Sequence, residues 1–185
     1  MLNSNLKFLL GALVVSISVL LVPIHASAQS FGGAFKGMGD NDQPIQIEAD
    51  RLEILDNENT AFLTGNVSVV QGTTILKAKQ LTVYYLRSDQ SDETNSGIRK
   101  IIASGKVAVR SQDNHATSDK AVVDMVTEIV TLTGNVFISQ GNNIAKGCEV
   151  IVNLKTSVSE IKPCASSQGS NRVKLLLDPK SRKTN

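Results

Sequence analysis

The sequence predicts an all-β fold of many short antiparallel strands, with essentially no helix after its first 28 residues. A Gly turn followed by apolar residues at every second position occurs three times, in segments 64–72, 104–109 and 133–141. This alternation is the pattern of a half-buried β-strand. Repetition of one strand unit predicts an architecture built by stacking, which exposes continuous surfaces rather than a single catalytic pocket.

The first 28 residues have the features of a signal peptide. Lys7 supplies positive charge, residues 8–22 form an apolar run, and Ala26-Ser27-Ala28 offers small residues at the positions that a signal peptidase reads. A retained membrane anchor is the alternative, but this run is shorter than the roughly 20 residues that span a bilayer. We therefore expect an exported chain that is cleaved after Ala28.

The residues that follow divide into a lead-in, one domain and a tail. Residues 29–43 are Gly-rich and nearly without β-branched side chains, which predicts a flexible lead-in. Residues 44–179 are expected to form one β-domain, because Pro44 marks the start of the strand pattern and Pro179 marks its end. Residues 180–185 are a polar, basic tail.

A second element recurs four times, offset from the first. Its copies are residues 47–54, 76–83, 116–123 and 145–152. Each copy holds two pairs of small or apolar positions, but the step between the pairs is three residues instead of two. Because strand side chains alternate with a period of two, a β-bulge or a bend must absorb one residue. The expected bend lies at a small residue each time: Ala49, Ala78, Ser118 and Gly147.

Bent strands repeated along a chain predict a folded-over structure in which each strand passes from one sheet to the other. The spacing from Ala49 to Ala78 equals that from Ser118 to Gly147, whereas the middle interval is longer. The polar residues 88–97 account for the difference and are expected to form a solvated loop. This alternation argues against a regular β-solenoid, whose repeat length would be constant.

The sequence resembles the OstA-like family. The similarity rests on Pro44-Ile45-Gln46-Ile47-Glu48-Ala49-Asp50, on the Thr-Gly-Asn-Val phrases at 64–67 and 133–136, each followed by Gln-Gly, and on the closing segment 171–179. The resemblance extends over roughly residues 44–179. It implies a twisted, open β-jelly roll, a periplasmic location and a non-enzymatic role in lipopolysaccharide transport.

The same resemblance implies a carrier that bridges the inner and outer membranes by head-to-tail assembly and shields lipid A acyl chains in an aliphatic groove. The implied partners are lipopolysaccharide, further copies of the chain, and inner-membrane-anchored and outer-membrane transport components with the same fold. The candidate lipid-binding residues are the inward aliphatic positions: Ile45, Ile47, Leu52, Ile54, Val67, Val69, Leu81, Val83, Val107, Val109, Val123, Val136, Ile138, Val150 and Val152. The same residues could form an ordinary sandwich core, and only the resemblance makes them a groove.

The first and last strands are the candidate assembly edges. Unpaired terminal strands of an open sheet are an aggregation hazard, but head-to-tail pairing of such edges yields a filament or a bridge. The edge residues are Ile45, Ile47 and Ala49 in the first strand, and Val173, Leu175 and Leu177 in the last.

Two cysteines, Cys148 and Cys164, remain after export to an oxidising compartment, which favours a disulfide between them. A hairpin of residues 150–154 and 158–162 that turns on Thr156 would place them opposite each other. A two-residue turn would break that pairing, so two unpaired thiols are the alternative.

The composition offers no support for catalysis, metal binding or nucleic-acid binding. His115 lies in a polar turn and has no serine and acid arranged with it as a triad, and two cysteines with one histidine are a poor metal site. A formal net charge of +2 does not provide the basic stripe of a nucleic-acid binder. No cofactor is expected. The alternatives are a membrane-anchored sister component, an exported β-solenoid adhesin or a polysaccharide-acting enzyme.

Overall fold

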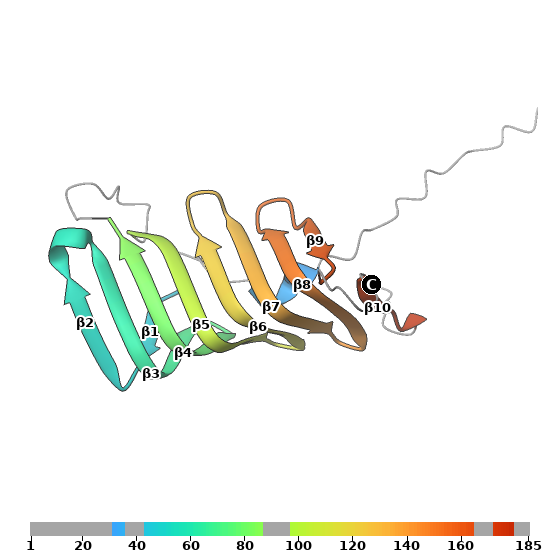
Figure 1. The fold of residues 1–185 in the computed structure, drawn as a ribbon, viewed down its shortest axis with the longest axis horizontal. Coiled ribbons are helices and arrows are strands. Elements are labelled where there is room, and N and C mark those ends of the chain that lie inside the picture. The colour runs from blue at the N-terminus through green and yellow to red at the C-terminus, as the bar shows by residue number, and fades with distance from the viewer. Residues whose placement is uncertain (1–30, 36–42, 87–96, 165–171, 180–185) are drawn as a thin grey trace, which may run out of the picture.

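One antiparallel sheet of ten strands makes up the fold (Figure 1). The computed structural model describes residues 31–35, 43–86, 97–164 and 172–179. The expected signal peptide, the tail of residues 180–185 and nearly all of the expected loop at 88–97 lie outside the described residues. Helical structure in the described part is limited to two short 3-10 turns, η1 (Phe31–Phe35) and η2 (Asp56–Glu58). The all-β prediction is confirmed.

Six long strands follow one another as a meander and form the body of the sheet. They are β3 (Thr60–Gln71), β4 (Thr74–Tyr85), β5 (Ile98–Ser111), β6 (Asn114–Asp124), β7 (Ile129–Gln140) and β8 (Asn143–Asn153). Two short strands pair with β3 at one end, β1 (Ile45–Glu48) and β2 (Arg51–Leu55). Two more pair with β8, β9 (Ser159–Lys162) and β10 (Lys174–Leu176). The two pairs of short strands therefore lie at opposite ends of the molecule (Figure 1).

Every long strand crosses a line of bends, here called the crease, that divides the sheet into two halves. The β1 half runs from β1 to β10, and the β2 half runs from β2 to β9. Apolar side chains on the inner faces of both halves form a single core cluster. The fold is therefore one sheet folded over on itself, instead of two sheets that exchange strands.

The register shows how the crease is built. Thr64 pairs with Gln80 and Val67 with Ala78, so two residues of β3 oppose one residue of β4. The extra residue on β3, β5 and β7 lies at a dipeptide with two positive φ angles: Gly65-Asn66, Gly105-Lys106 and Gly134-Asn135. Two successive left-handed residues form a bulge that bends the strand and increases its twist.

The expected bend positions require a correction, because the extra residue lies on the neighbouring strands. Ala78, Ser118 and Gly147 are the register partners of Val67, Val107 and Val136, just beyond the bulges. Small side chains suit this crowded inner corner, but the left-handed backbone that makes the bend needs Gly followed by a residue such as Asn. The parity break in the sequence was correctly located, and its cause is on the adjacent strand.

The lead-in also departs from the prediction of a flexible segment. Ala34 and Phe35 of η1 have no exposed surface and belong to the core cluster. The segment packs against β5, β6, β7 and β8, and Figure 1 shows it behind β7 and β8. At Gly33 a Cβ would lie 2.9 Å from the side-chain amide of Asn114, so the close approach favours glycine. Burial of an aromatic ring stabilises this placement by about 1.5–3 kcal/mol.

Candidate functional site

Most of the candidate lipid-binding residues lie on the inner faces of the two halves, where they are packed against one another. Eleven of the fifteen are no more than 6% exposed: Val67, Val69, Leu81, Val83, Val107, Val109, Val123, Val136, Ile138, Val150 and Val152. The other four lie on β1 and β2, where Ile45 is partly buried, and Ile47, Leu52 and Ile54 are 36%, 57% and 55% exposed. The predicted stripe is therefore a closed core that becomes uncovered at its β1–β2 end.

The sequence reading missed inner-face residues on the N-terminal side of each Gly turn. Leu63 and Leu132 are buried two residues before Gly65 and Gly134. The alternation that follows the glycine also precedes it, and this signal could have identified them. The reading also missed Phe35, which its strand periodicity could not have detected.

The interior leaves little free space in this conformation. A cavity of about 10 Å³ lies between the two halves, where Ile45, Val69 and Thr74 approach Ile101 and Met125. That volume suits about one water molecule. An acyl chain would require the two halves to move apart at this position.

The end of the sheet formed by the last strand also exposes inner-face apolar side chains. Leu175 pairs with Ala145, which is 1% exposed and faces inward, yet Leu175 itself is 53% exposed because no strand follows it. Leu177 is 52% exposed, and Val173 is half-buried. Both ends of the fold thus present the open cross-section of its core.

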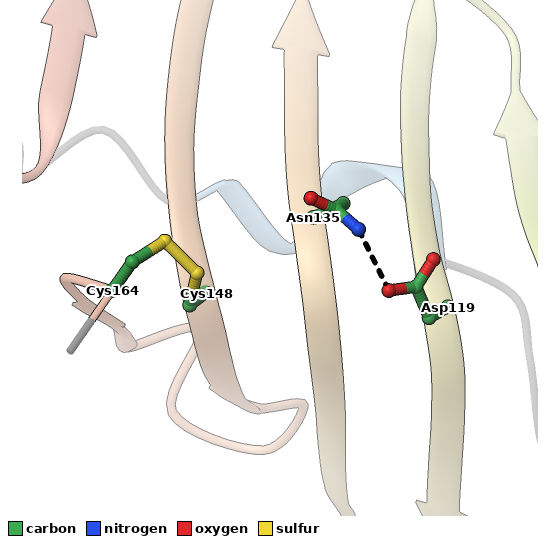
Figure 2. Close-up of a disulfide and its surroundings, with 4 residues drawn as sticks. All are labelled: Asp119, Asn135, Cys148 and Cys164. Atoms are coloured by element: carbon green, nitrogen blue, oxygen red, sulfur yellow. Dashed lines mark hydrogen bonds between the residues drawn. A yellow bond between two sulfur atoms is a disulfide. The ribbon is translucent and has the colours of Figure 1, made fainter. Parts of the chain in front are cut away.

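Polar pairs lie on the outer side of the crease at equivalent positions of the repeat. Asn66 Nδ2 donates a hydrogen bond of 3.0 Å to Asp50, and Asn135 Nδ2 donates one of 2.8 Å to Asp119 (Figure 2). A Cβ on Gly134 would lie 2.8 Å from the Cβ of Asp119, so this contact requires glycine at the bulge. Each pair ties the left-handed turn of one strand to its neighbour.

Cys148 occupies the next equivalent position, and there a disulfide to Cys164 takes the place of the carboxylate–amide pair (Figure 2). The Cα atoms are 4.8 Å apart, within the usual range for a disulfide. The described residues contain no free cysteine. The bond holds the segment that follows β9 against the crease of β8.

The hairpin register differs by one residue from the prediction. Val150 pairs with Ile161 and Val152 with Ser159, so the turn is centred between Lys155 and Thr156. A continued ladder would place Pro163 opposite Cys148, but the paired residues end at Lys162. Proline has no backbone N–H to extend the ladder, so Cys164 is free to turn toward Cys148.

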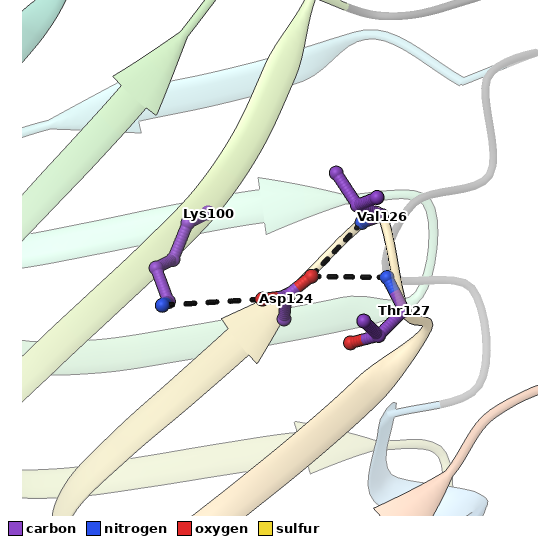
Figure 3. A network of polar contacts seen from close by, with 4 residues as sticks. All are labelled: Lys100, Asp124, Val126 and Thr127. Carbon is purple, nitrogen blue, oxygen red and sulfur yellow. Dashed lines mark hydrogen bonds and ion pairs between the residues drawn. The ribbon is translucent and has the colours of Figure 1, made fainter.

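The turn between β6 and β7 is held by a carboxylate. Oδ1 of Asp124 accepts hydrogen bonds from the backbone N–H groups of Val126 at 3.1 Å and Thr127 at 3.0 Å (Figure 3). Nζ of Lys100 lies 3.9 Å from Oδ2. The hydrogen bond from the Thr127 backbone holds the pKa of Asp124 below its ordinary value, with smaller contributions from Val126 and Lys100.

Asp124→Asn should therefore make stability less sensitive to acid. A lowered folded-state pKa adds stability above the unfolded-state value of about 3.9 and loses it as the pH falls further. We expect the variant to be less stable by about 1 kcal/mol at neutral pH, with the difference shrinking below about pH 4. Urea unfolding of both proteins between pH 3 and 7 measures this, and a constant difference over that range would contradict the assignment.

The described residues show no catalytic or metal constellation and no membrane span. No group of three His, Cys, Asp or Glu side chains within them could hold a metal ion. His115 lies on β6 opposite Arg110 and Ser139. None of the helices in that part of the chain is long and apolar enough to cross a membrane.

Comparison with known proteins agrees with the fold and the sequence pattern. Residues 46–158 match the family model described as LptA/(LptD N-terminal domain) LPS transport protein. An uncharacterized protein of Rhizobium meliloti (strain 1021) is 39% identical over 93% of this chain and 91% of its own length. The lipopolysaccharide export system protein LptA of Escherichia coli (strain K12) is 30% identical over 79% of this chain and 77% of its own length.

A solved structure shows the same fold. The crystal structure of LptH of Pseudomonas aeruginosa, described as the LptA homologous periplasmic component of a lipopolysaccharide transport device, has a TM-score of 0.63. The match covers 76% of this chain and 99% of LptH at 18% identity. The family match and the relatives confirm the OstA-like resemblance. The chain belongs to the family of LptA and LptD N-terminal-domain lipopolysaccharide transport proteins.

Proposed function

We propose that this protein is a periplasmic carrier of lipopolysaccharide that shields lipid A acyl chains between the two halves of its sheet. We further propose that copies assemble head to tail into a bridge between the inner and outer membranes. Its other partners would be an inner-membrane-anchored component and an outer-membrane component with the same fold. The family description, which joins LptA with the N-terminal domain of LptD, supports partners of this kind.

The observation that carries the proposal is the uncovered inner face at both ends. Leu52 and Ile54 at one end and Leu175 and Leu177 at the other are each more than half exposed, although they continue the buried inner rows of the sheet. Exposed apolar side chains that form one surface mark a site of interaction with lipid or protein. Apposition of two such ends would join the inner faces of successive copies.

Acyl chains bring enough free energy to compete with the closed core. Each buried methylene is worth about 0.8 kcal/mol, so a chain of about twelve carbons is worth on the order of 10 kcal/mol. The halves meet along a thin aliphatic layer that includes small residues such as Ala103, Ala116, Ala121 and Ala145. When such a layer opens, acyl chains can cover the apolar side chains that the opposite half covered before, so that the inner faces stay out of water.

The strand directions support head-to-tail growth. The meander from β3 to β8 contains an even number of strands, so the outer strands at the two ends run in opposite directions. When one copy follows another, β1 meets β10 and β2 meets β9 as antiparallel neighbours. The ladder can therefore continue from copy to copy without a change of pattern.

Site-specific photo-crosslinking to purified lipopolysaccharide tests the groove. A photoreactive residue at Leu52 should capture the lipid, because this side chain faces inward, while the same residue at neighbouring Glu53 should not. Both side chains are more than half exposed, so the pair differs mainly in the face that it occupies. Val83 and Thr82 provide an inward and outward pair within the body of the sheet. Equal capture from the inward and outward positions would contradict the proposal.

A further inference from the structure

Rows of register partners cross the whole sheet of the β1 half, from one end strand to the other. One outer row begins at Glu48 on β1 and ends at Lys174 on β10, by way of Ser68, Lys77, Ala108, Thr117, Phe137 and Lys146. The adjacent inner row begins at Ile47 and ends at Leu175. Each row thus ends in side chains that would complement each other: opposite charges on the outer face and apolar groups on the inner face.

We propose that the joint between two copies is made by the β1 half, with Lys174 of one copy opposite Glu48 of the next and Leu175 opposite Ile47. This inference rests on the proposed head-to-tail assembly and adds its register and its determining residues. The occupant of each end is a second copy of this chain, because the two ends of one molecule supply both halves of every pair.

The charges at these ends are available for such a joint. Glu48 is exposed and accepts a hydrogen bond only from the neutral amide of Gln46, at 2.9 Å, among the contacts of the described residues. Lys174 is exposed and forms no ion pair in the described part of the chain. It lies beside Lys146, whose Nζ is 5.5 Å from the centre of the Phe137 ring. Two neighbouring lysines at the end of the row favour an incoming carboxylate.

The β2 half is different, and this difference makes the register specific. Its outer rows run from Arg51 to Lys162 and from Glu53 to Glu160, so in the same register they would bring like charges together. Like charges directly opposite each other destabilise a strand pair. The attractive contacts of the joint are therefore expected from β1 and β10, while the β2–β9 contact is weaker.

Matched charge reversals at the same end of the molecule test this inference. Glu48→Lys should weaken association of the mature chain roughly tenfold at low salt, because it places lysine opposite Lys174. Glu53→Lys makes the same change of charge but removes the repulsion with Glu160, so association should be unchanged or tighter. Sedimentation velocity over a range of protein concentrations measures both effects, and salt near 1 M should reduce them because the screening length falls to about 3 Å.

Complementation identifies the pair itself. Lys174→Glu alone should weaken association as much as Glu48→Lys, whereas a mixture of the two single variants should recover it by forming joints between unlike copies. The double variant should also recover it. Equal weakening by Glu48→Lys and Glu53→Lys, or a mixture that stays weak, overturns the proposed register while leaving head-to-tail assembly intact. A wild-type chain that stays monomeric at every concentration overturns both proposals.

Discussion

Phe35→Ala is expected to lower the free energy of unfolding by about 3–5 kcal/mol, the range for loss of a fully buried aromatic ring. The side chain has no exposed surface and lies in the core cluster with residues from both halves of the sheet. Because η1 packs against β5, β6, β7 and β8, removal of the ring leaves a space beside four strands at once. Urea unfolding followed by circular dichroism measures the loss.

Phe62→Ala provides the matched control, since Phe62 is 37% exposed on β3. We expect this variant to lose no more than about 1 kcal/mol, because less area returns to water. If both variants unfold at the same urea concentration as the wild type, η1 does not pack in the core in solution. Removal of residues 29–35 from the mature chain should then also be without effect, whereas docked η1 predicts a loss at least as large as that of Phe35→Ala.

Periodicity predicted the repeated strands well, because each long strand has one buried and one solvated face. It also revealed the bend, since Ala78 and Leu81 are both buried although an odd number of residues separates them. The sequence placed the bulge on the wrong strand, because a parity break in one strand does not identify which neighbour carries the extra residue. The Gly-Asn dipeptides were visible, but they were interpreted as turns before strands instead of bulges within them.

The docked η1 segment could not be predicted by the same means. A single turn has no period, and the Gly-rich composition around Phe35 is also that of a linker. Its position depends on a complementary space on the inner faces of four strands, which exists only after the sheet has folded. The size of the candidate groove was equally beyond the pattern, because alternation distinguishes inward from outward residues but not a filled interior from an open one.

The cysteine pair shows how a local irregularity can defeat an inference from register. A regular hairpin centred between Lys155 and Thr156 would have separated the two thiols. Pro163 ends the ladder one residue before Cys164, and the sequence contained this signal. The repeat contained another, because Cys148 stands where Asp50 and Asp119 stand in earlier copies and hydrogen bond to a neighbouring strand.

Loss of the disulfide should be the other large effect on stability. Cys148 and Cys164 close a loop with a sequence separation of 16 residues, and a loop of this length is worth about 3 kcal/mol in the chain-entropy account. We expect Cys148→Ser with Cys164→Ser to lower the free energy of unfolding by that amount. Wild-type protein treated with dithiothreitol should unfold at the same urea concentration as the double variant.

Asp119→Ala is the matched control, because it removes the equivalent cross-strand tie at the preceding bend. A single exposed hydrogen bond contributes about 0.5–1.5 kcal/mol, so this variant should lose markedly less stability than the double serine variant. The loss should also be local: in hydrogen exchange the amides of β9 should lose protection, whereas those of β4 to β6 should keep it. Equal losses from the two variants would show that the disulfide adds no constraint beyond a polar contact, and unchanged exchange in β9 would contradict its role in holding that strand to β8.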